Sequence, residues 1–179
     1  DARNHRAGRV SFSIRRLTRD DVDAYRAIRL EALTNHPESY GTSPQSFAAR
    51  PRDAVQAMLD RMAIFGVLTE AGTLAGIVAY ARDDGERETH RGWLLQVYVQ
   101  PELRGTGASL ALLEAAVEHA SGEVIQLHLM VGAHNAPAIR LYEKAGFKTY
   151  GTDPRCFYVN GRYIDEHMMV RFLDEAPGK

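Results

Sequence analysis

The chain has 179 residues, 45% of them hydrophobic and 25% charged, which is long enough for one domain with a substantial core. Its 22 Lys and Arg residues against 23 Asp and Glu residues leave a formal net charge of −1, so charge gives no reason to expect nucleic acid or a membrane as a partner. The single cysteine, Cys156, excludes a disulfide within this chain and thiolate clusters for zinc or iron–sulfur centres, so we expect no metal and a reducing, cytoplasmic location.

Hydropathy along the chain predicts a soluble protein. No segment approaches the roughly 18 consecutive apolar residues of a membrane-spanning helix. Residues 1–10 contain three arginines but no apolar core of a secretory signal, so we expect a flexible N-terminal tail there. Because no repeat and no Pro-, Gly- or Ser-rich linker divides the rest, residues 11–173 should form one domain, followed by a C-terminal tail at 174–179.

Local patterns in the first half of the chain predict a strand, two helices and two more strands. Alternating polar and apolar residues mark the strands, and apolar residues at helical spacing mark the helices. The expected elements are a strand at 11–17, a helix at 20–33, a loop of turn-forming residues at 35–44, a helix near 52–62, and two strands between 63 and 82 joined at 70–73.

The second half predicts four further strands and two helices. Residues 93–99 (WLLQVYV) are almost continuously apolar, as in a strand covered on both faces. Asn135 and Gly146 are expected to cap the start and the end of the last helix, and Asn160-Gly161 is a strong hairpin signal. The expected elements are a strand at 93–99, a helix at 107–120, a strand at 124–131, a helix at 135–146, and two strands on either side of Asn160-Gly161.

The order βααβββαβαββ predicts the fold class. Seven strands and four helices in this order indicate a mixed α/β fold, in which the helices pack on one sheet. We expect a twisted, mostly antiparallel sheet of about seven strands with four helices packed on it.

A turn with two glycines separates the strand at 93–99 from the helix at 107–120. Gly105 and Gly107 let a ligand approach the main chain closely, and the start of the helix adds unpaired N–H groups and the positive end of its dipole. Arg104 can add a charged contact, so the turn suits a phosphate group. A tight turn without a ligand is the alternative.

Two common phosphate-binding loops do not match this turn. A P-loop needs Gly-Lys-Ser/Thr after the glycines, and the stretch has no lysine. A dinucleotide fingerprint needs a third glycine where Leu110 stands, and the acidic residue about 20 positions further on would be Glu123, at the wrong end of the next strand.

Two longer motifs occur at residues 97–107 (VYVQPELRGTG) and 135–147 (NAPAIRLYEKAGF). Both resemble signatures of the GNAT superfamily of N-acetyltransferases. Val97 to Gly107 (VYVQPELRGTG) is similar to its acetyl-coenzyme A signature, in which Arg/Gln-x-x-Gly-x-Gly/Ala follows a V-x-P strand end. Asn135 to Phe147 (NAPAIRLYEKAGF) is similar to the second signature, N-x-x-A-x-x-L-Y-x-x-x-G-F. The resemblance extends over Ser11 to Phe172, and it departs at Ser109, where the family prefers glycine or alanine.

The resemblance implies a GNAT-like fold and transfer of an acetyl group from acetyl-coenzyme A, as co-substrate, to a primary amine by direct attack in a ternary complex. It implies that the pyrophosphate lies on the turn from Arg104 to Ser109, and that main-chain groups of the preceding strand hold the acetyl carbonyl, with Val99 nearest. An ordinary central strand is the alternative for Val97 to Val99. The cofactor-binding residues expected on this basis are Val97, Tyr98, Val99, Arg104, Gly105, Thr106, Gly107, Ala108, Ser109, Asn135 and Tyr142.

Tyr142 is the expected catalytic residue. Asn135, Ala138 and Tyr142 share one helix face, which should face the thioester sulfur, so the phenol can protonate the leaving thiolate. With pKa values of about 10 for a phenol and about 8.5 for a thiol, the transfer is mildly uphill. The alternative is a core aromatic residue with its hydroxyl at the rim.

The general base cannot be assigned from the motifs. Family members often carry a glutamate on the strand at 93–99, but this strand has only Gln96. A water chain to a more distant acceptor is therefore expected, and Glu31, Glu88 and His90 are weak candidates for that acceptor.

The resemblance implies that the acceptor is a small-molecule amine or a protein amino group. By family analogy, the loop from Glu38 to Pro44, including Tyr40, and the strand from Tyr163 to His167 should border its pocket. The sequence leaves a homodimer open. It also leaves open a non-catalytic module that binds or senses acyl-coenzyme A.

Overall fold

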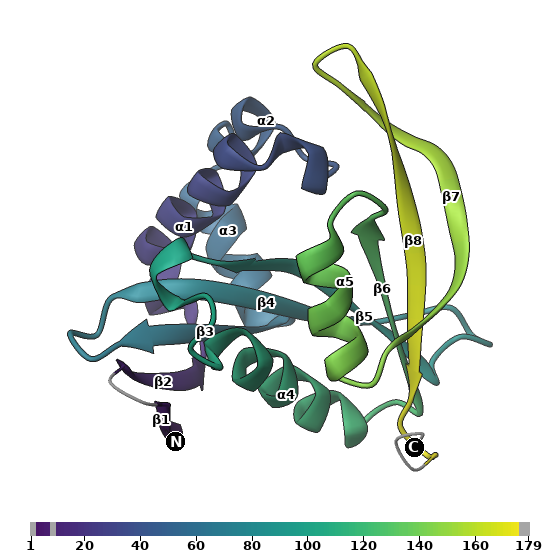
Figure 1. The fold of residues 1–179 in the computed structure, drawn as a ribbon. Helices are drawn as coiled ribbons and strands as arrows, with labels where there is room; N and C mark the ends of the chain where they lie inside the picture. The colour runs from purple at the N-terminus through teal and green to yellow at the C-terminus, as the bar shows by residue number, and fades with distance from the viewer. Residues whose placement is uncertain (1–2, 8–9, 176–179) are drawn as a thin grey trace.

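Eight strands form one sheet in the order β1-β2-β3-β4-β5-β6-β8-β7 in the computed structural model, which describes residues 3–7 and 10–175 (Figure 1). All neighbouring strands are antiparallel except β5 and β6, which are parallel. The strands are β1 (Arg3–Ala7), β2 (Val10–Arg16), β3 (Ala63–Thr69), β4 (Leu74–Arg82), β5 (Arg91–Val99), β6 (Gln126–Gly132), β7 (Lys148–Val159) and β8 (Arg162–Phe172). The predicted mixed, mostly antiparallel sheet is confirmed.

Helices cover both faces of the sheet. Along β3 and β4, alternate residues enter two separate apolar cores, one shared with α4 and the other with α1 and α3 (Figure 1). The helices are α1 (Val22–Asn35), α2 (Pro44–Ala48), α3 (Arg52–Arg61), α4 (Ala108–Ser121) and α5 (Ala136–Lys144). None of the described helices is long and apolar enough to cross a membrane.

Two elements depart from the sequence prediction. Residues 3–7, expected within a flexible tail, form β1 along the edge of β2. An edge strand is held by main-chain hydrogen bonds, so the segment RNHRA needs no apolar alternation to form it. The fifth helix, α2, has only five residues, too few for an apolar repeat, and begins where the Ser43 hydroxyl caps Ser46 N–H before Pro44. Of the other predicted tail residues, Val10 begins β2 and residues 174–175 are described after β8, whereas residues 1–2, 8–9 and 176–179 lie outside the described residues.

β5 and β6 separate after three paired positions, and this separation creates the site. Arg91 to Trp93 pair with Gln126 to His128, and no further pairs follow. β5 also carries a bulge at Gln96, whose φ of 58° lies in the left-handed region. The expectation that β5 is covered on both faces is wrong, because Leu95 is 40% exposed and the strand lines an opening beyond the last pair.

Candidate active site

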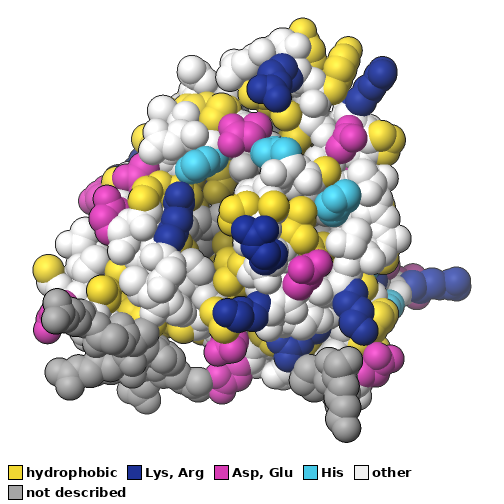
Figure 2. Space-filling model, viewed as in Figure 1, with side chains coloured by type: hydrophobic (Ala, Val, Ile, Leu, Met, Phe, Trp, Pro, Cys, Tyr) yellow, Lys and Arg dark blue, Asp and Glu magenta, His cyan; other side chains and the backbone are white. Residues whose placement is uncertain are grey.

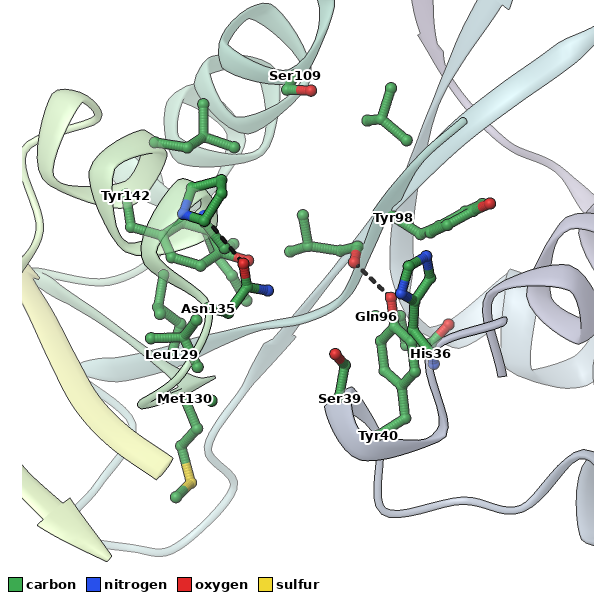
Figure 3. Close-up of a pocket in the computed structure, with 18 of the residues that line it drawn as sticks. His36, Ser39, Tyr40, Gln96, Tyr98, Ser109, Leu129, Met130, Asn135 and Tyr142 are labelled. Atoms are coloured by element: carbon green, nitrogen blue, oxygen red, sulfur yellow. Dashed lines mark hydrogen bonds between the residues drawn. The ribbon is translucent and has the colours of Figure 1, made fainter. Parts of the chain in front are cut away.

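A cavity of about 1000 Å³ lies where β5 and β6 part. It is lined by the loop after α1, by β5, by the turn before α4, by β6 and by one side of α5 (Figure 3). In the space-filling view, the face of the molecule that includes α5 is hollowed, with histidine side chains near the upper rim (Figure 2). His36 and His134 belong to the lining.

The edge of β5 facing the cavity has no strand partner. Val97 O accepts a hydrogen bond from the Tyr40 hydroxyl at 2.8 Å (Figure 3). Val99 O accepts one from Arg104 Nε at 3.0 Å. In an antiparallel strand, the N–H and C=O groups of one residue point to the same edge, and those of the residue two positions further on point to that edge as well. The N–H groups of Val97 and Val99 therefore point to the cavity side as well, where a ligand can meet them.

The turn before α4 has the conformation that its glycines allow. Gly105 and Gly107 have φ values of 74° and 86°, and Gly107 is the N-cap of α4 without a capping side chain. The first helical hydrogen bond runs from Ala111 N–H to Gly107 O, so the N–H groups of Ser109 and Leu110 have no partner within the helix. Both residues line the cavity.

Two of the predicted cofactor-binding residues do not line the cavity. The Thr106 hydroxyl donates a hydrogen bond to Leu103 O at 2.5 Å and braces the turn from inside. Ala108 is fully buried in the core beneath α4. The other nine line the cavity, namely Val97, Tyr98, Val99, Arg104, Gly105, Gly107, Ser109, Asn135 and Tyr142.

The start of α5 forms the wall opposite Tyr40. Asn135 caps the helix, as predicted, by accepting a hydrogen bond from Ala138 N–H at 3.3 Å, and Gly146 follows its end with a φ of 89°. Asn135 and Tyr142 lie on the same side of the cavity (Figure 3). The predicted shared face of Asn135, Ala138 and Tyr142 is confirmed, because all three line the cavity.

Tyr142 is 7% exposed, and its ring packs edge-on against Phe147 at 6.4 Å. Its hydroxyl makes no hydrogen bond to any residue that the structure describes. Burial, and then the neighbouring Tyr40, raise the pKa of Tyr142 above its ordinary value, so the phenol carries its proton at neutral pH.

Glu166 on β8 is a buried carboxylate that lines the cavity; the sequence analysis included it only in the strand expected to border the acceptor pocket and gave it no role in catalysis. It is 4% exposed and accepts a hydrogen bond from Cys156 Sγ at 3.4 Å. Burial and the nearby Asp153 raise its pKa. No motif marks this position, and only its pairing with Gly132, at the end of β6, brings it to the site.

The base candidates named from the sequence lie elsewhere. Glu88 and His90 are exposed on the β4–β5 turn and do not line the cavity. Glu31 accepts a hydrogen bond from the Tyr98 hydroxyl at 2.7 Å, so it meets the cavity only through Tyr98. Of the segments expected to border the acceptor pocket, residues 38–42 and Glu166 contribute to the lining.

Cys156 is not suited to act as a nucleophile. Burial and hydrogen bonds to Asp153 and Glu166 raise its pKa to about 12, which keeps the thiol protonated. Within residues 3–7 and 10–175, no group of three or more His, Cys, Asp or Glu side chains could hold a metal ion.

Comparison with known proteins identifies the family. Residues 26–147 match the family model described as Acetyltransferase (GNAT) family. The chain is 31% identical over 173 residues to L-methionine sulfoximine/L-methionine sulfone acetyltransferase of Pseudomonas aeruginosa, covering 92% of this chain and 96% of that protein. It is 32% identical over 137 residues to mycothiol acetyltransferase of Propionibacterium freudenreichii, covering 75% of this chain but 42% of that protein, so it spans less than half of that relative.

The fold matches as well. The structure of yncA from Salmonella typhimurium with its cofactor acetyl-CoA aligns with a TM-score of 0.79 at 21% identity, covering 93% of this chain and 98% of that one. Together with the two sequence motifs and the parted strands β5 and β6, these matches show that the chain belongs to the GNAT family of acetyltransferases.

Proposed function

We propose that the protein transfers the acetyl group of acetyl-coenzyme A to the primary amine of a small molecule, by direct attack in a ternary complex. One observation carries the proposal. The free edge of β5 opens into a cavity that has the unpaired start of α4 at one side and Tyr142 at another. These are the parts needed to hold an acyl thioester and to stabilise the charge that develops during its transfer.

The turn from Arg104 to Ser109 is suited to the pyrophosphate of the cofactor. The N–H groups of Ser109 and Leu110 are unpaired within α4, and the helix dipole adds partial positive charge there. A Cβ at Gly105 would meet nothing within 4 Å, so it is the positive φ that requires glycine, and open space remains over the turn for a phosphate. When bound, acetyl-coenzyme A supplies an activated acetyl group.

The N–H groups of Val97 and Val99 are the proposed donors to the acetyl carbonyl and to the arm that carries it, with Val99 nearest the carbonyl. The carbonyl oxygens of the same two residues already accept hydrogen bonds from Tyr40 and Arg104, and these bonds hold the strand edge in place before a ligand binds. Donors held in place in this way stabilise an oxyanion without reorganising during the reaction.

Tyr142 is the proposed partner of the departing thiolate. Its hydroxyl has no described protein partner and faces the cavity, so it is free to donate a hydrogen bond to sulfur (Figure 3). Because burial raises the pKa of Tyr142, full proton transfer to a thiolate with a pKa of about 8.5 is more uphill than for an ordinary phenol. Tyr142 therefore acts mainly as a hydrogen-bond donor that lowers the charge on sulfur.

Glu166 is the proposed proton acceptor for the attacking amine, directly or through water. A buried carboxylate with a raised pKa is a better base than one in water, because its proton affinity is closer to that of the group it deprotonates. Gln96, on the strand where family members often carry a glutamate, cannot accept the proton because a neutral amide is not a base.

The test combines binding with turnover. Calorimetry with coenzyme A is expected to show binding that competes with acetyl-coenzyme A, and release of free thiol is expected with at least one small amine. A parallel arm with peptide N-termini and lysine side chains asks whether a protein amino group serves as acceptor. Cofactor binding without thiol release for any amine or peptide would instead support a non-catalytic acyl-coenzyme A binding module.

A further inference from the structure

We propose that the acceptor carries a carboxylate beside its amine, as an amino acid does, and that Arg29 binds this carboxylate at the end of the cavity formed by α1, Tyr40 and Gln96. The inference rests on the proposed acetyl transfer, since it names the class of acceptor for the same cavity. It assigns a specificity-determining role to a residue outside both sequence motifs.

Arg29 is a buried cation without a partner. Its side chain lines the cavity, the residue is only 6% exposed, and it makes no hydrogen bond or ion pair to any residue that the structure describes. Its Nη1 atom is shut off from solvent and has no hydrogen-bond partner. Buried charges in proteins are almost always paired, so an unpaired guanidinium on a cavity wall indicates that its partner is a ligand.

The groups around Arg29 cannot neutralise it. The ionisable side chains that act on it are Tyr25, Tyr40 and Arg50. The Tyr40 ring lies 4.7 Å from the guanidinium carbon, which gives a cation–π contact but no anion. Burial raises the pKa of Tyr40 to about 12, so it stays neutral at physiological pH. The carboxylate of Glu31, two residues further along α1, is already engaged by Tyr98 and Gln100.

Gln96 offers a second donor on the same side. Tyr25, one helical turn before Arg29, donates its hydroxyl hydrogen to Gln96 Oε1 at 2.5 Å. This bond holds the amide oxygen and leaves the amide N–H groups for the cavity, which Gln96 lines. The residue has a φ of 58°, a strained conformation for a side chain of this kind, which is common where geometry serves a site.

The Arg29 guanidinium and the Gln96 amide N–H groups are hydrogen-bond donors that lack an acceptor among the described residues, so this end of the cavity favours an anionic group. A carboxylate is planar and takes two parallel hydrogen bonds from a guanidinium, so it fits Arg29 better than a hydroxyl or a neutral amide would. The anchor also lies beside the reacting edge, because Tyr40 stacks on Arg29 with its ring and binds Val97 O with its hydroxyl. A carboxylate held by Arg29 would therefore direct a neighbouring amine toward β5.

The experiment compares L-amino acids with their primary amides and their decarboxylated amines, using thiol release from acetyl-coenzyme A. For the wild-type chain, kcat/KM for the acid is expected to exceed that for the matched amide by about 10- to 100-fold, the usual effect of a hydrogen bond to a charged group. Arg29→Gln should raise KM for the acid by a similar factor and leave KM for the amide nearly unchanged. Arg29→Lys should lie between the two, because it keeps the charge but loses the fork of donors.

Two further variants separate recognition from folding. Arg50→Gln removes the same charge from an exposed arginine that stacks on Phe47, and it should leave the acid-to-amide ratio unchanged. Gln96→Glu keeps the bond from Tyr25 but puts a negative charge on the Arg29 side of the cavity, so it should lower kcat/KM for the acid more than for the amide. Calorimetry with coenzyme A should give the wild-type affinity for all four variants, which shows that the cofactor half is intact.

The outcomes are distinct. Acetylation of amides and decarboxylated amines as fast as of the acids, or an equal loss for acid and amide in Arg29→Gln, would overturn the acceptor class and leave acetyl transfer standing. Absence of thiol release with every amine, despite coenzyme A binding, would overturn both.

Discussion

Tyr40 joins the loop after α1 to the free edge of β5, because its hydroxyl donates a hydrogen bond to Val97 O at 2.8 Å (Figure 3). Tyr40→Phe keeps the ring over Arg29 but removes this bond. We expect the free energy of unfolding to fall by about 1 kcal/mol, the typical net value of one hydrogen bond. Urea unfolding measures it, with Tyr163→Phe as the control, since Tyr163 is 62% exposed at the β7–β8 hairpin. Equal stability of Tyr40→Phe and Tyr163→Phe would mean that the bond contributes nothing to folding.

Tyr142→Phe tests the leaving-group role. The variant should bind coenzyme A with unchanged affinity and turn over about 10²-fold more slowly, because the thiolate then departs without a hydrogen-bond donor. Thiol release under saturating substrates measures the rate. Tyr158→Phe removes a hydroxyl from a residue that is 66% exposed and should retain full activity. If Tyr142→Phe turns over at the wild-type rate, Tyr142 is a packing residue only.

Gly105→Ala and Gly72→Ala form a matched pair for the pyrophosphate site. Their φ values are 74° and 82°, and at neither position would a Cβ meet another atom within 4 Å. Both substitutions should therefore cost a similar amount of stability, about 1–2 kcal/mol, from backbone strain alone. Only Gly105→Ala should also weaken coenzyme A binding, because Gly72 lies on the β3–β4 turn and does not line the cavity. Calorimetry measures the affinity of each variant for coenzyme A. Equal affinities in the two variants would mean that the turn from Arg104 to Ser109 does not bind the cofactor.

Glu166→Gln should lower kcat/KM at neutral pH by about 10²-fold or more, because the amide cannot accept the proton from the amine. In the wild-type chain, activity should fall as the pH drops through the raised pKa of Glu166, above the ordinary value of 4.5. A pH–rate profile measures this limb, which should be absent from the residual activity of the variant. Glu38→Gln, at the other carboxylate lining the cavity, is the control and should keep the acid limb.

Glu166→Gln should also stabilise the folded state. Because folding raises the pKa of Glu166, the stability associated with its protonated form is complete below pH 4.5 and is lost as the pH rises through the folded-state value. At pH 7 the wild-type chain thus carries a buried charge that Glu166→Gln removes. We expect a higher Tm for the variant at pH 7 and a difference that shrinks toward pH 4. A lower Tm at pH 7 would contradict this account of the carboxylate.

The sequence predicted those parts of the fold that have local signals. Asn135 and Gly146 delimit α5, and Asn160-Gly161 joins β7 to β8, because caps and tight turns depend on a few adjacent residues. β1 lacks such signals, and α2 has a capping residue at Ser43 but is too short to show an apolar repeat. The parting of β5 from β6 lacks one as well, since a continuous apolar run is equally typical of a fully paired strand.

The candidate site divides in the same way. The turn from Arg104 to Ser109 and the face of α5 with Tyr142 follow from contiguous motifs, and nine of the eleven residues expected there line the cavity. Arg29 and Gln96 could not be placed at the cavity from the sequence, and Glu166 was expected there only as part of the strand from Tyr163 to His167, by family analogy and without a role. Arg29 reads as one charge on an amphipathic helix, Gln96 gains its strained conformation only from the bulge, and Glu166 comes to the cavity only through sheet register.

Because β5 and β6 part, the main-chain hydrogen-bonding groups along one edge of β5 have no partner strand, and this bears on aggregation. Unpaired edges on an outer surface invite other chains to add a strand and aggregate. Here the unpaired part of β5 faces the cavity, with α5 on one side and the loop that contains Tyr40 on the other (Figure 3). A ligand that fills the cavity would cover the unpaired main-chain groups of β5. The ligand-bound protein should therefore stay in solution at temperatures at which the ligand-free protein begins to precipitate.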